Sequence, residues 1–192
     1  MEVIAIKNKD QIAKMKKNLR SSSMRDYGMF VIGINIGLRI SDLVTLKFSD
    51  LYEDGKIKDV LYIKDKKTKN NKSKRLSIVT INSSAKAIIK EYKSSITNFD
   101  YDQYLFQSRK GLNEPISERS AWRILNTAGK QVGIKHIGTH SMRKTFGYWI
   151  YKKTKDIALV QKMLNHKSSA DTLRYIGITQ DDMTRAVKNL NL

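Results

Sequence analysis

Apolar side chains at every third or fourth position dominate the first part of the chain and predict helices there. Residues 8–19 carry such a stripe, which is typical of a helix with one buried face. A second helix is expected to begin after Ser23, whose hydroxyl can cap it, and to end at Gly37, since glycine suits the left-handed conformation that follows many helices. A shorter helix is expected over residues 41–46.

The pattern changes to alternation between residues 58 and 80. Two segments rich in β-branched and aromatic residues carry it, VLYIKD and RLSIVTI, and the polar run KKTKNNKSK separates them. This arrangement predicts an antiparallel β-hairpin with a basic, flexible tip.

Helical spacing returns after the hairpin and continues to the end of the chain. The expected helices run from a cap at Asn82 or Ser83 through Tyr92, from Ser117 to near Gly133, from a cap at Thr139 over His140 to about Tyr151, from Asp156 through Met163, over a short segment that holds Leu173 and Tyr175, and from Thr179 to Leu190. No repeat or Pro-rich linker interrupts the pattern. We therefore expect one domain over residues 1–192, of the α+β class but mostly α, with a small antiparallel sheet.

The charge balance adds a polyanionic partner to this picture. The chain has 37 Lys and Arg against 18 Asp and Glu, a formal net charge of +19. Such a surplus repels itself in the compact state, and nucleic acid is the leading partner because binding releases condensed counterions. An anionic membrane is the second candidate, although no strongly basic amphipathic terminal helix stands out. A general solubility effect would also explain the charge.

Several classes of site are missing from the sequence. There is no cysteine, no Gly-rich phosphate loop, no secretory signal and no apolar run long enough to span a membrane, so we expect a cytoplasmic protein without disulfides. His136 and His140 are four residues apart, but no Glu follows His136 and Gly138 lies between them, so a zinc protease site is not expected. Because carboxylates are also few, we expect neither a metal nor a cofactor. Phosphoryl chemistry would then depend on cationic side chains.

Such side chains occur in a distinctive order. The first is Arg39, in the segment GLRISDLVTLKFSDL, followed by Lys67 beside Thr68 in the hairpin. The third segment, THSMRKTFG, carries an H-x-x-R pair. The last, LNHKSSADTLRYIGI, places one histidine nine residues before a tyrosine.

From about residue 8 to residue 190, this set of motifs resembles the tyrosine recombinase family, also called phage integrases. Each motif alone is weak, but their common order is a strong signal. The resemblance implies a helical DNA breaking-rejoining enzyme fold, a site-specific recombinase of bacterial or phage origin that acts at the nucleoid, and double-stranded DNA as the substrate. It also implies catalytic roles for Arg39, Lys67, His140, Arg143, His166 and Tyr175.

The chemistry of these residue types agrees with those roles. A tyrosine hydroxyl has a pKa near 10 and needs a base or a positive field to become a nucleophile. Arg39 and Arg143 can bind the non-bridging oxygens of a phosphate and stabilise the charge of the transition state. In this scheme His140 is a general base or a hydrogen-bond donor, His166 holds a phosphate oxygen, and Lys67 protonates the departing 5′ oxygen.

Some of these assignments have alternatives. Arg39 taken alone could pair with Asp42 or Asp50 at the surface. The hairpin lysine is chosen among several candidates, and Lys67 is preferred because it precedes Thr68. We expect the remaining basic residues to contact DNA phosphates or to be solvated: Lys66, Lys69, Lys72, Lys74 and Lys144. We expect the aromatic residues Trp122, Trp149, Tyr148 and Tyr151 to pack in the core, and His136 to lie in a loop without a role.

The chain departs from most relatives in its length. No core-binding or arm-binding domain is expected ahead of the catalytic domain, because Arg39 lies so close to Met1. The chain is then either a piece of a longer integrase or one of the short stand-alone recombinases. The segment from Thr179 to Leu192 resembles the family's segment that docks onto a neighbouring protomer, so we expect a monomer that assembles as a tetramer on paired DNA sites. The alternative function is a catalytically silent DNA-binding regulator with the same fold.

Overall fold

The computed structural model describes residues 3–64, 76–188 and 190. Its helices and strands lie in the order α1 Lys9–Ser22, α2 Met24–Ile36, α3 Ile40–Leu43, α4 Phe48–Leu51, β1 Tyr52–Glu53, β2 Lys56–Ile57, β3 Val60–Lys64, β4 Leu76–Thr80, α5 Ser83–Ser94, α6 Glu118–Gln131, α7 Thr139–Thr154, α8 Ile157–Met163, α9 Ser169–Ile176 and α10 Gln180–Lys188. The expected class, mostly α with a small antiparallel sheet, is confirmed.

Local capping determines where several helices begin and end. The Asn8 side chain accepts a hydrogen bond from the Asp10 amide at 2.7 Å, and Ser23 caps α2 in the same way. Gly37 ends α2 with a φ of 65°, and a Cβ there would lie 2.2 Å from the Phe146 ring. Only glycine therefore fits between α2 and the residues that follow it.

One expected cap was wrong. Thr139 is the first residue of α7, and Gly138 occupies the cap position in front of it. The Gly138 amide donates to the Ser141 hydroxyl at 3.1 Å. The hydroxyl that hydrogen-bonds the cap residue thus belongs to Ser141, inside the helix. The spacing of apolar residues does not reveal this.

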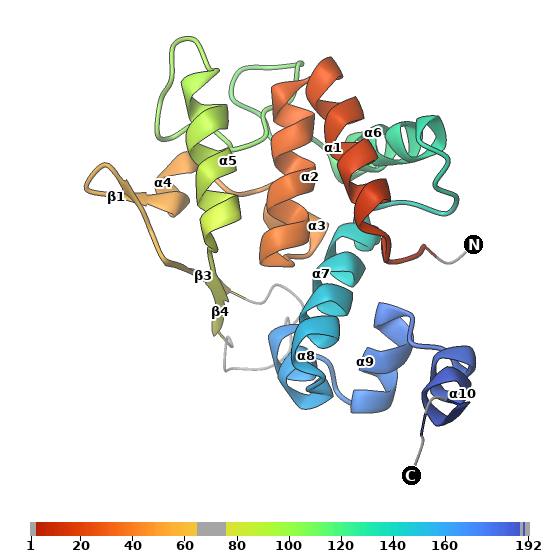
Figure 1. The fold of residues 1–192 in the computed structure, drawn as a ribbon. Coiled ribbons are helices and arrows are strands. Elements are labelled where there is room, and N and C mark those ends of the chain that lie inside the picture. Colours follow the sequence, from red (N-terminus) through yellow and green to blue (C-terminus); the bar gives the residue numbers. More distant parts are fainter. Residues whose placement is uncertain (1–2, 65–75, 189, 191–192) are drawn as a thin grey trace.

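The main hydrophobic core surrounds α2. In Figure 1 this helix lies between α1 and α5, and α7 continues below it toward α8 and α9. Met29, Phe30 and Ile32 of α2 are fully buried. Because apolar residues cover α2 almost all round, it acts as the central helix of the domain.

A second, smaller core lies between α7, α8 and α9. Val160, Leu164 and Ile176 form its centre, and the partly buried side chains around them include Tyr148, Tyr151 and Tyr175. Tyr148 and Tyr151 therefore pack as expected. This cluster attaches the helix that carries Tyr175 to the rest of the molecule.

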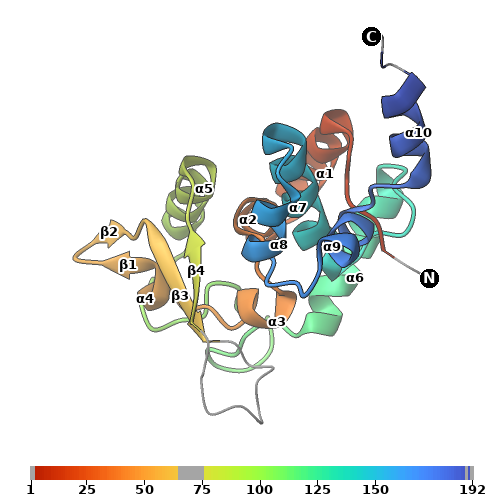
Figure 2. The same cartoon turned by 90° about the horizontal axis from the view of Figure 1, so that it is seen from below.

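The strands form two separate hairpins (Figure 2). Strand β3 pairs with β4 in antiparallel register from Val60 opposite Thr80 to Lys64 opposite Leu76. The paired strands confirm the expected antiparallel hairpin over residues 60–64 and 76–80, and its expected basic tip lies outside the described residues. The small β1–β2 hairpin and α4 had no counterpart among the expected elements, because segments this short carry no periodicity.

The tryptophans differ from expectation. Trp122 is 47% exposed, so its expected place in the core was wrong, since the apolar spacing of α6 does not show which face meets the core. Trp149 is partly buried, and its indole N–H donates to the Ile6 carbonyl at 3.0 Å. Over the residues that the structure places, no helix is both long and apolar enough to cross a bilayer.

Candidate active site

The candidate site forms where residues from the ends of α3, α8 and α9 meet α7. Arg39 lies at the N-terminus of α3, directly after the turn at Gly37. Arg143 is in the first half of α7, His166 follows the end of α8, and Tyr175 lies in the last turn of α9. Figure 2 shows α7, α8 and α9 next to one another.

Arg143 connects two of these chain segments. Its side chain is only 8% exposed, and its guanidinium donates to the Gly37 carbonyl at 2.5 Å and to the Leu164 carbonyl at 2.6 Å. Gly37 lies two residues before Arg39 in the chain, and Leu164 lies two residues before His166. Arg143 thereby holds both segments in a fixed relation, besides offering positive charge to the site.

Tyr175 lies against His166. Their ring centroids are 4.7 Å apart at an interplanar angle of 82°, an edge-to-face contact. Burial raises the pKa of the Tyr175 phenol above its usual value of 10, and this outweighs the charges of Arg143 and Arg39 and a hydrogen bond from Arg143, which lower it. Tyr175 is therefore protonated at neutral pH in the free protein, and the hydroxyl must lose its proton during the reaction.

The tautomer of His166 follows from its hydrogen bonds. The buried Thr172 hydroxyl donates its one hydrogen to the Ser168 carbonyl at 2.8 Å, and the same oxygen lies 3.2 Å from His166 Nδ1. The hydroxyl must then accept from an Nδ1–H group, which leaves Nε2 of a neutral ring as an acceptor. His166 can donate from Nε2 to a phosphate oxygen only when the ring is protonated.

The pKa of His166 is lowered from its usual value near 6.5, first by burial and then by Arg143 and Arg39. At a pH between the pKa of His166 in the folded protein and its pKa near 6.5 in the unfolded chain, the unfolded chain binds more protons. The folded protein therefore loses stability as the pH decreases through this range.

We expect an NMR titration of the His166 ring to show a midpoint below 6.5, and Arg39→Gln to raise this midpoint by removing a positive neighbour. A wild-type midpoint at or above 6.5 would contradict this assignment.

The other expected site residues lie in different surroundings. His140 is exposed in the first turn of α7, one turn before Arg143. Lys144 is buried, and its Nζ lies 5.2 Å from the centroid of the Tyr175 ring. The basic residues of the hairpin tip lie outside the described residues: Lys66, Lys67, Lys69, Lys72 and Lys74.

A cleft of about 420 Å³ lies beside Arg39 and Arg143. The β3–β4 hairpin forms one wall, α8 forms the other, and Asp42 lies in it next to Arg39. Arg39 and Arg143 therefore line the same cleft. The Asp50 carboxylate accepts a hydrogen bond from the Lys47 amide at 2.8 Å.

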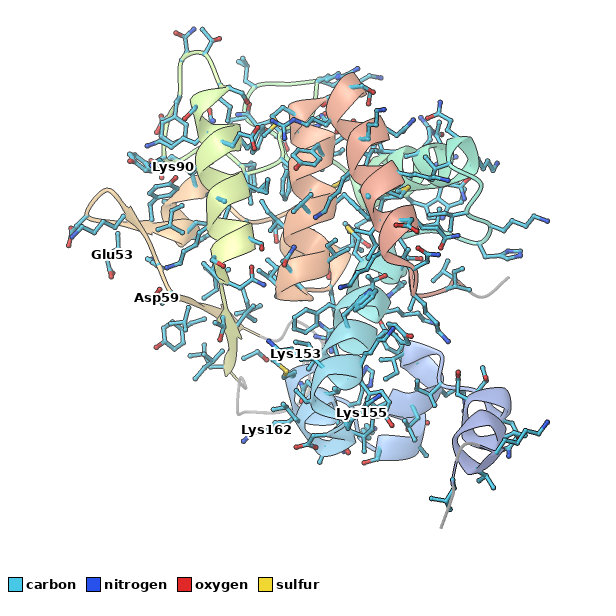
Figure 3. The ribbon with its side chains drawn as sticks, in the orientation of Figure 1. Glu53, Asp59, Lys90, Lys153, Lys155 and Lys162 are labelled. Atoms are coloured by element: carbon cyan, nitrogen blue, oxygen red, sulfur yellow. The ribbon has the colours of Figure 1, made fainter. Side chains whose placement is uncertain are left out.

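Two further residues of this cleft were not identified from the sequence. Lys162 is exposed on α8 at the rim, on the side of the hairpin (Figure 3). Asn165 has a positive φ of 50°, in the turn between Leu164 and His166. The sequence signal for both was their closeness to His166 in the chain, which alone does not show that they face the cleft.

Comparisons with known proteins agree with this geometry. The model of the phage integrase family matches residues 5–181. The chain is 40% identical over 183 residues to the probable integrase/recombinase YoeC of Bacillus subtilis, covering 95% of this chain and 94% of YoeC. It is 27% identical over 186 residues to the tyrosine recombinase XerA of Pyrococcus furiosus, but spans only 60% of that protein.

Solved structures show the same fold. A crystal structure of the XerA recombinase superposes with a TM-score of 0.74 at 21% identity, over the whole of this chain and 66% of the other. The XerH recombinase, in a post-cleavage complex with its palindromic difH substrate, gives 0.70 at 19% identity, over 96% of this chain and 52% of the other. A lambda integrase dimer bound to a core site gives 0.67 at 19%, over 94% and 62%.

Proposed function

The chain belongs to the phage integrase family, and we propose that it is a site-specific tyrosine recombinase in which Tyr175 attacks a DNA phosphate. The observation that carries this proposal is the convergence of Arg39, Arg143 and His166 on the one tyrosine that the motif order selects among nine. The family and the fold inferred from the motifs are confirmed by the comparisons.

The proposed reaction uses cations to stabilise an anionic transition state. Arg39 and Arg143 bind the non-bridging oxygens of the scissile phosphate, and the Tyr175 oxygen attacks phosphorus. The phenol proton passes to a histidine base, either His140 or His166, whose Nε2 is an acceptor while the ring is neutral. The bond to the 5′ oxygen breaks, and Lys67 supplies the proton that makes it a hydroxyl.

The product is a 3′-phosphotyrosyl linkage and a free 5′ hydroxyl. One phosphate ester has replaced another, so a 5′ hydroxyl can reverse the step without an external energy source. Attack by the hydroxyl of a partner strand gives recombination, and attack by the original strand restores the substrate.

Double-stranded DNA is the proposed partner. The net charge of +19 suits a polyanion, and the cleft brings Arg39, Arg143 and Lys162 to one side of the hairpin. The structures of XerH with difH and of lambda integrase with its core site support this, since each is similar in fold and holds DNA. The tip lysines Lys66, Lys69, Lys72 and Lys74 would add phosphate contacts.

The test of this function is a covalent adduct. A nicked duplex that carries the recombination site loses its short 5′-hydroxyl fragment after cleavage and traps the intermediate. We expect a protein–DNA adduct that survives SDS and forms in EDTA. Trypsin cuts after Arg174 and Arg185, so residues 175–185 form one peptide whose only tyrosine is Tyr175, and the DNA remnant should map to it. A protein that binds its site tightly yet never forms an adduct would instead be the silent regulator.

Assembly into a tetramer on paired sites is part of the proposal. Helix α10 lies at the edge of the molecule (Figure 1), and Val187 and Leu190 are 71% and 61% exposed. Such apolar side chains at a chain end suit a contact with another protomer. Sedimentation should show a monomer without DNA and four protomers on two synapsed sites; a tetramer without DNA would contradict this.

In this proposal, residues 1–192 are one catalytic domain. Helix α7 supports this, because Met142 lies in the main core while Phe146, Tyr148 and Ile150 contact the smaller cluster. A single cooperative unfolding transition is therefore expected. Two separate unfolding transitions measured by calorimetry would show that the chain forms more than one domain.

A further inference from the structure

Lys144 is a buried cation for which the scheme above has no use. It follows Arg143 on α7 and is only 6% exposed, although lysine is among the residue types least often buried. Burial of an ammonium group is unfavourable unless neighbouring groups compensate for the lost water.

We propose that Lys144 is a positioning residue that holds the ring of Tyr175 in its attacking orientation. The Lys144 Nζ lies 5.2 Å from the centroid of that ring, within the range of a cation–π interaction. The proposal rests on Tyr175 being the nucleophile, and it assigns to Lys144 a role in the orientation of the phenol.

The contacts around Tyr175 show how this works. The His166 ring meets the Tyr175 ring edge to face, and Arg143 hydrogen-bonds the hydroxyl. The Lys144 ammonium adds a third contact on the ring itself. Because a tyrosine side chain has two rotatable bonds, contacts on the ring and on the hydroxyl together restrict both. Arg143 and Lys144 are neighbours on one rigid helix, so hydroxyl and ring are held by the same element.

A cation beside the ring also favours the reacting form. A positive charge near a phenol stabilises the phenolate relative to the neutral hydroxyl, so it aids proton loss as the oxygen attacks. Burial strengthens this effect, because little water screens the interaction between the Lys144 ammonium and the phenolate of Tyr175. Orientation and charge thus act in the same direction.

This role differs from the DNA contact that we expected for Lys144. The Lys144 ammonium lies over the Tyr175 ring, whereas Lys162 is exposed at the rim of the cleft. The two roles predict different measurements. Loss of a phosphate contact lowers the dependence of binding on salt by about one unit of slope, while loss of a positioning contact leaves that slope unchanged.

The experiment compares charge-removing variants on the nicked duplex. Lys144→Met keeps the length of the side chain, and we expect the single-turnover cleavage rate at saturating DNA to fall roughly 10- to 100-fold, as for other misplaced reacting groups. The dissociation constant and its salt slope should stay as in wild type. Lys144→Arg keeps a cation over the ring and should recover part of the rate.

Two control variants make the comparison specific. Lys162→Gln should lower the salt slope by about one, which shows that the binding assay detects a phosphate contact. Lys90→Met makes the same chemical change on α5, at an exposed position far from α8 and α9 (Figure 3), and should leave both rate and slope unchanged. The proposal is overturned if Lys144→Met lowers the salt slope and cleaves at the wild-type rate once saturated.

A second readout needs neither DNA nor catalysis. With 13Cζ-labelled tyrosine, the Tyr175 resonance is identified by its loss in Tyr175→Phe. We expect Lys144→Met to shift this resonance, because the ring loses the cation that lies over it. If Lys144→Met does not fold, Lys144→Gln serves for the same comparison. If the wild type forms no adduct, the assignment of Tyr175 as the nucleophile is wrong. If Lys144→Met cleaves normally and leaves the Tyr175 resonance unchanged, only the proposed role of Lys144 is wrong.

Discussion

Tyr175→Phe should form no SDS-stable adduct on the nicked duplex, with cleavage reduced on the order of 10⁴-fold or more, as when other enzymes lose a nucleophile. The substitution removes the attacking oxygen and nothing else of comparable size. The phenylalanine ring keeps the edge contact with His166 and the position beneath Lys144. We therefore expect DNA affinity to stay near that of wild type, and stability to change by about 1 kcal/mol through the lost hydrogen bond from Arg143.

Tyr151→Phe is the matched control for this experiment. Tyr151 is also partly buried and packs against the same small cluster, but it lies on α7 rather than on α9. Loss of its hydroxyl should leave the adduct intact. If Tyr175→Phe still forms the adduct, another tyrosine is the nucleophile, and the tryptic peptide that carries the DNA remnant would identify it.

Arg143→Ala is expected to lower both the cleavage rate and the stability. Removal of one donor to the charge of a transition state commonly costs about 10²- to 10³-fold in rate. The same change leaves the carbonyls of Gly37 and Leu164 without their present donor, at about 1–3 kcal/mol for each buried group. The pKa of Tyr175 should rise further, because Arg143 lowers it both by its charge and by its hydrogen bond.

Two other variants separate catalysis from folding. Arg143→Lys keeps the charge but lacks the planar fork that reaches both carbonyls, so the rate should remain well below wild type. Arg25→Ala removes a similar arginine, whose guanidinium donates to the Gln107 carbonyl at 2.7 Å, from a place outside the site. It should lower the melting temperature while folded molecules cleave normally. A wild-type rate for Arg143→Ala at saturating DNA, measured below its melting temperature, would show that Arg143 is only structural.

Much of the helical framework could be predicted because its signals are local. A helix cap such as Ser23 or Asn82 depends on residues within one turn, so the sequence could predict it and the structure confirms it. The alternation of residues 58–80 identified the hairpin for the same reason. Short elements such as β1 and β2 were missed because they contain too few residues to show a period.

The site itself was only partly predictable. The order of the motifs selected Arg39, Arg143, His166 and Tyr175, and the structure brings these four residues together. The role of an individual cation was not readable. Lys144 and Lys162 look alike in the sequence, yet one lies inside against a ring and the other at the rim of a cleft.

The sequence by itself determined the family, the positions of most helices and the residue types available for chemistry, because these depend on composition, order and neighbours in the chain. Only the tertiary structure decided which groups meet. Arg143 bonds a carbonyl 106 residues away, and the Nδ1–H tautomer of His166 depends on a buried hydroxyl of the next helix. The physical reason is that burial and hydrogen-bond partners arise from the packing of α7, α8 and α9, which no local pattern specifies.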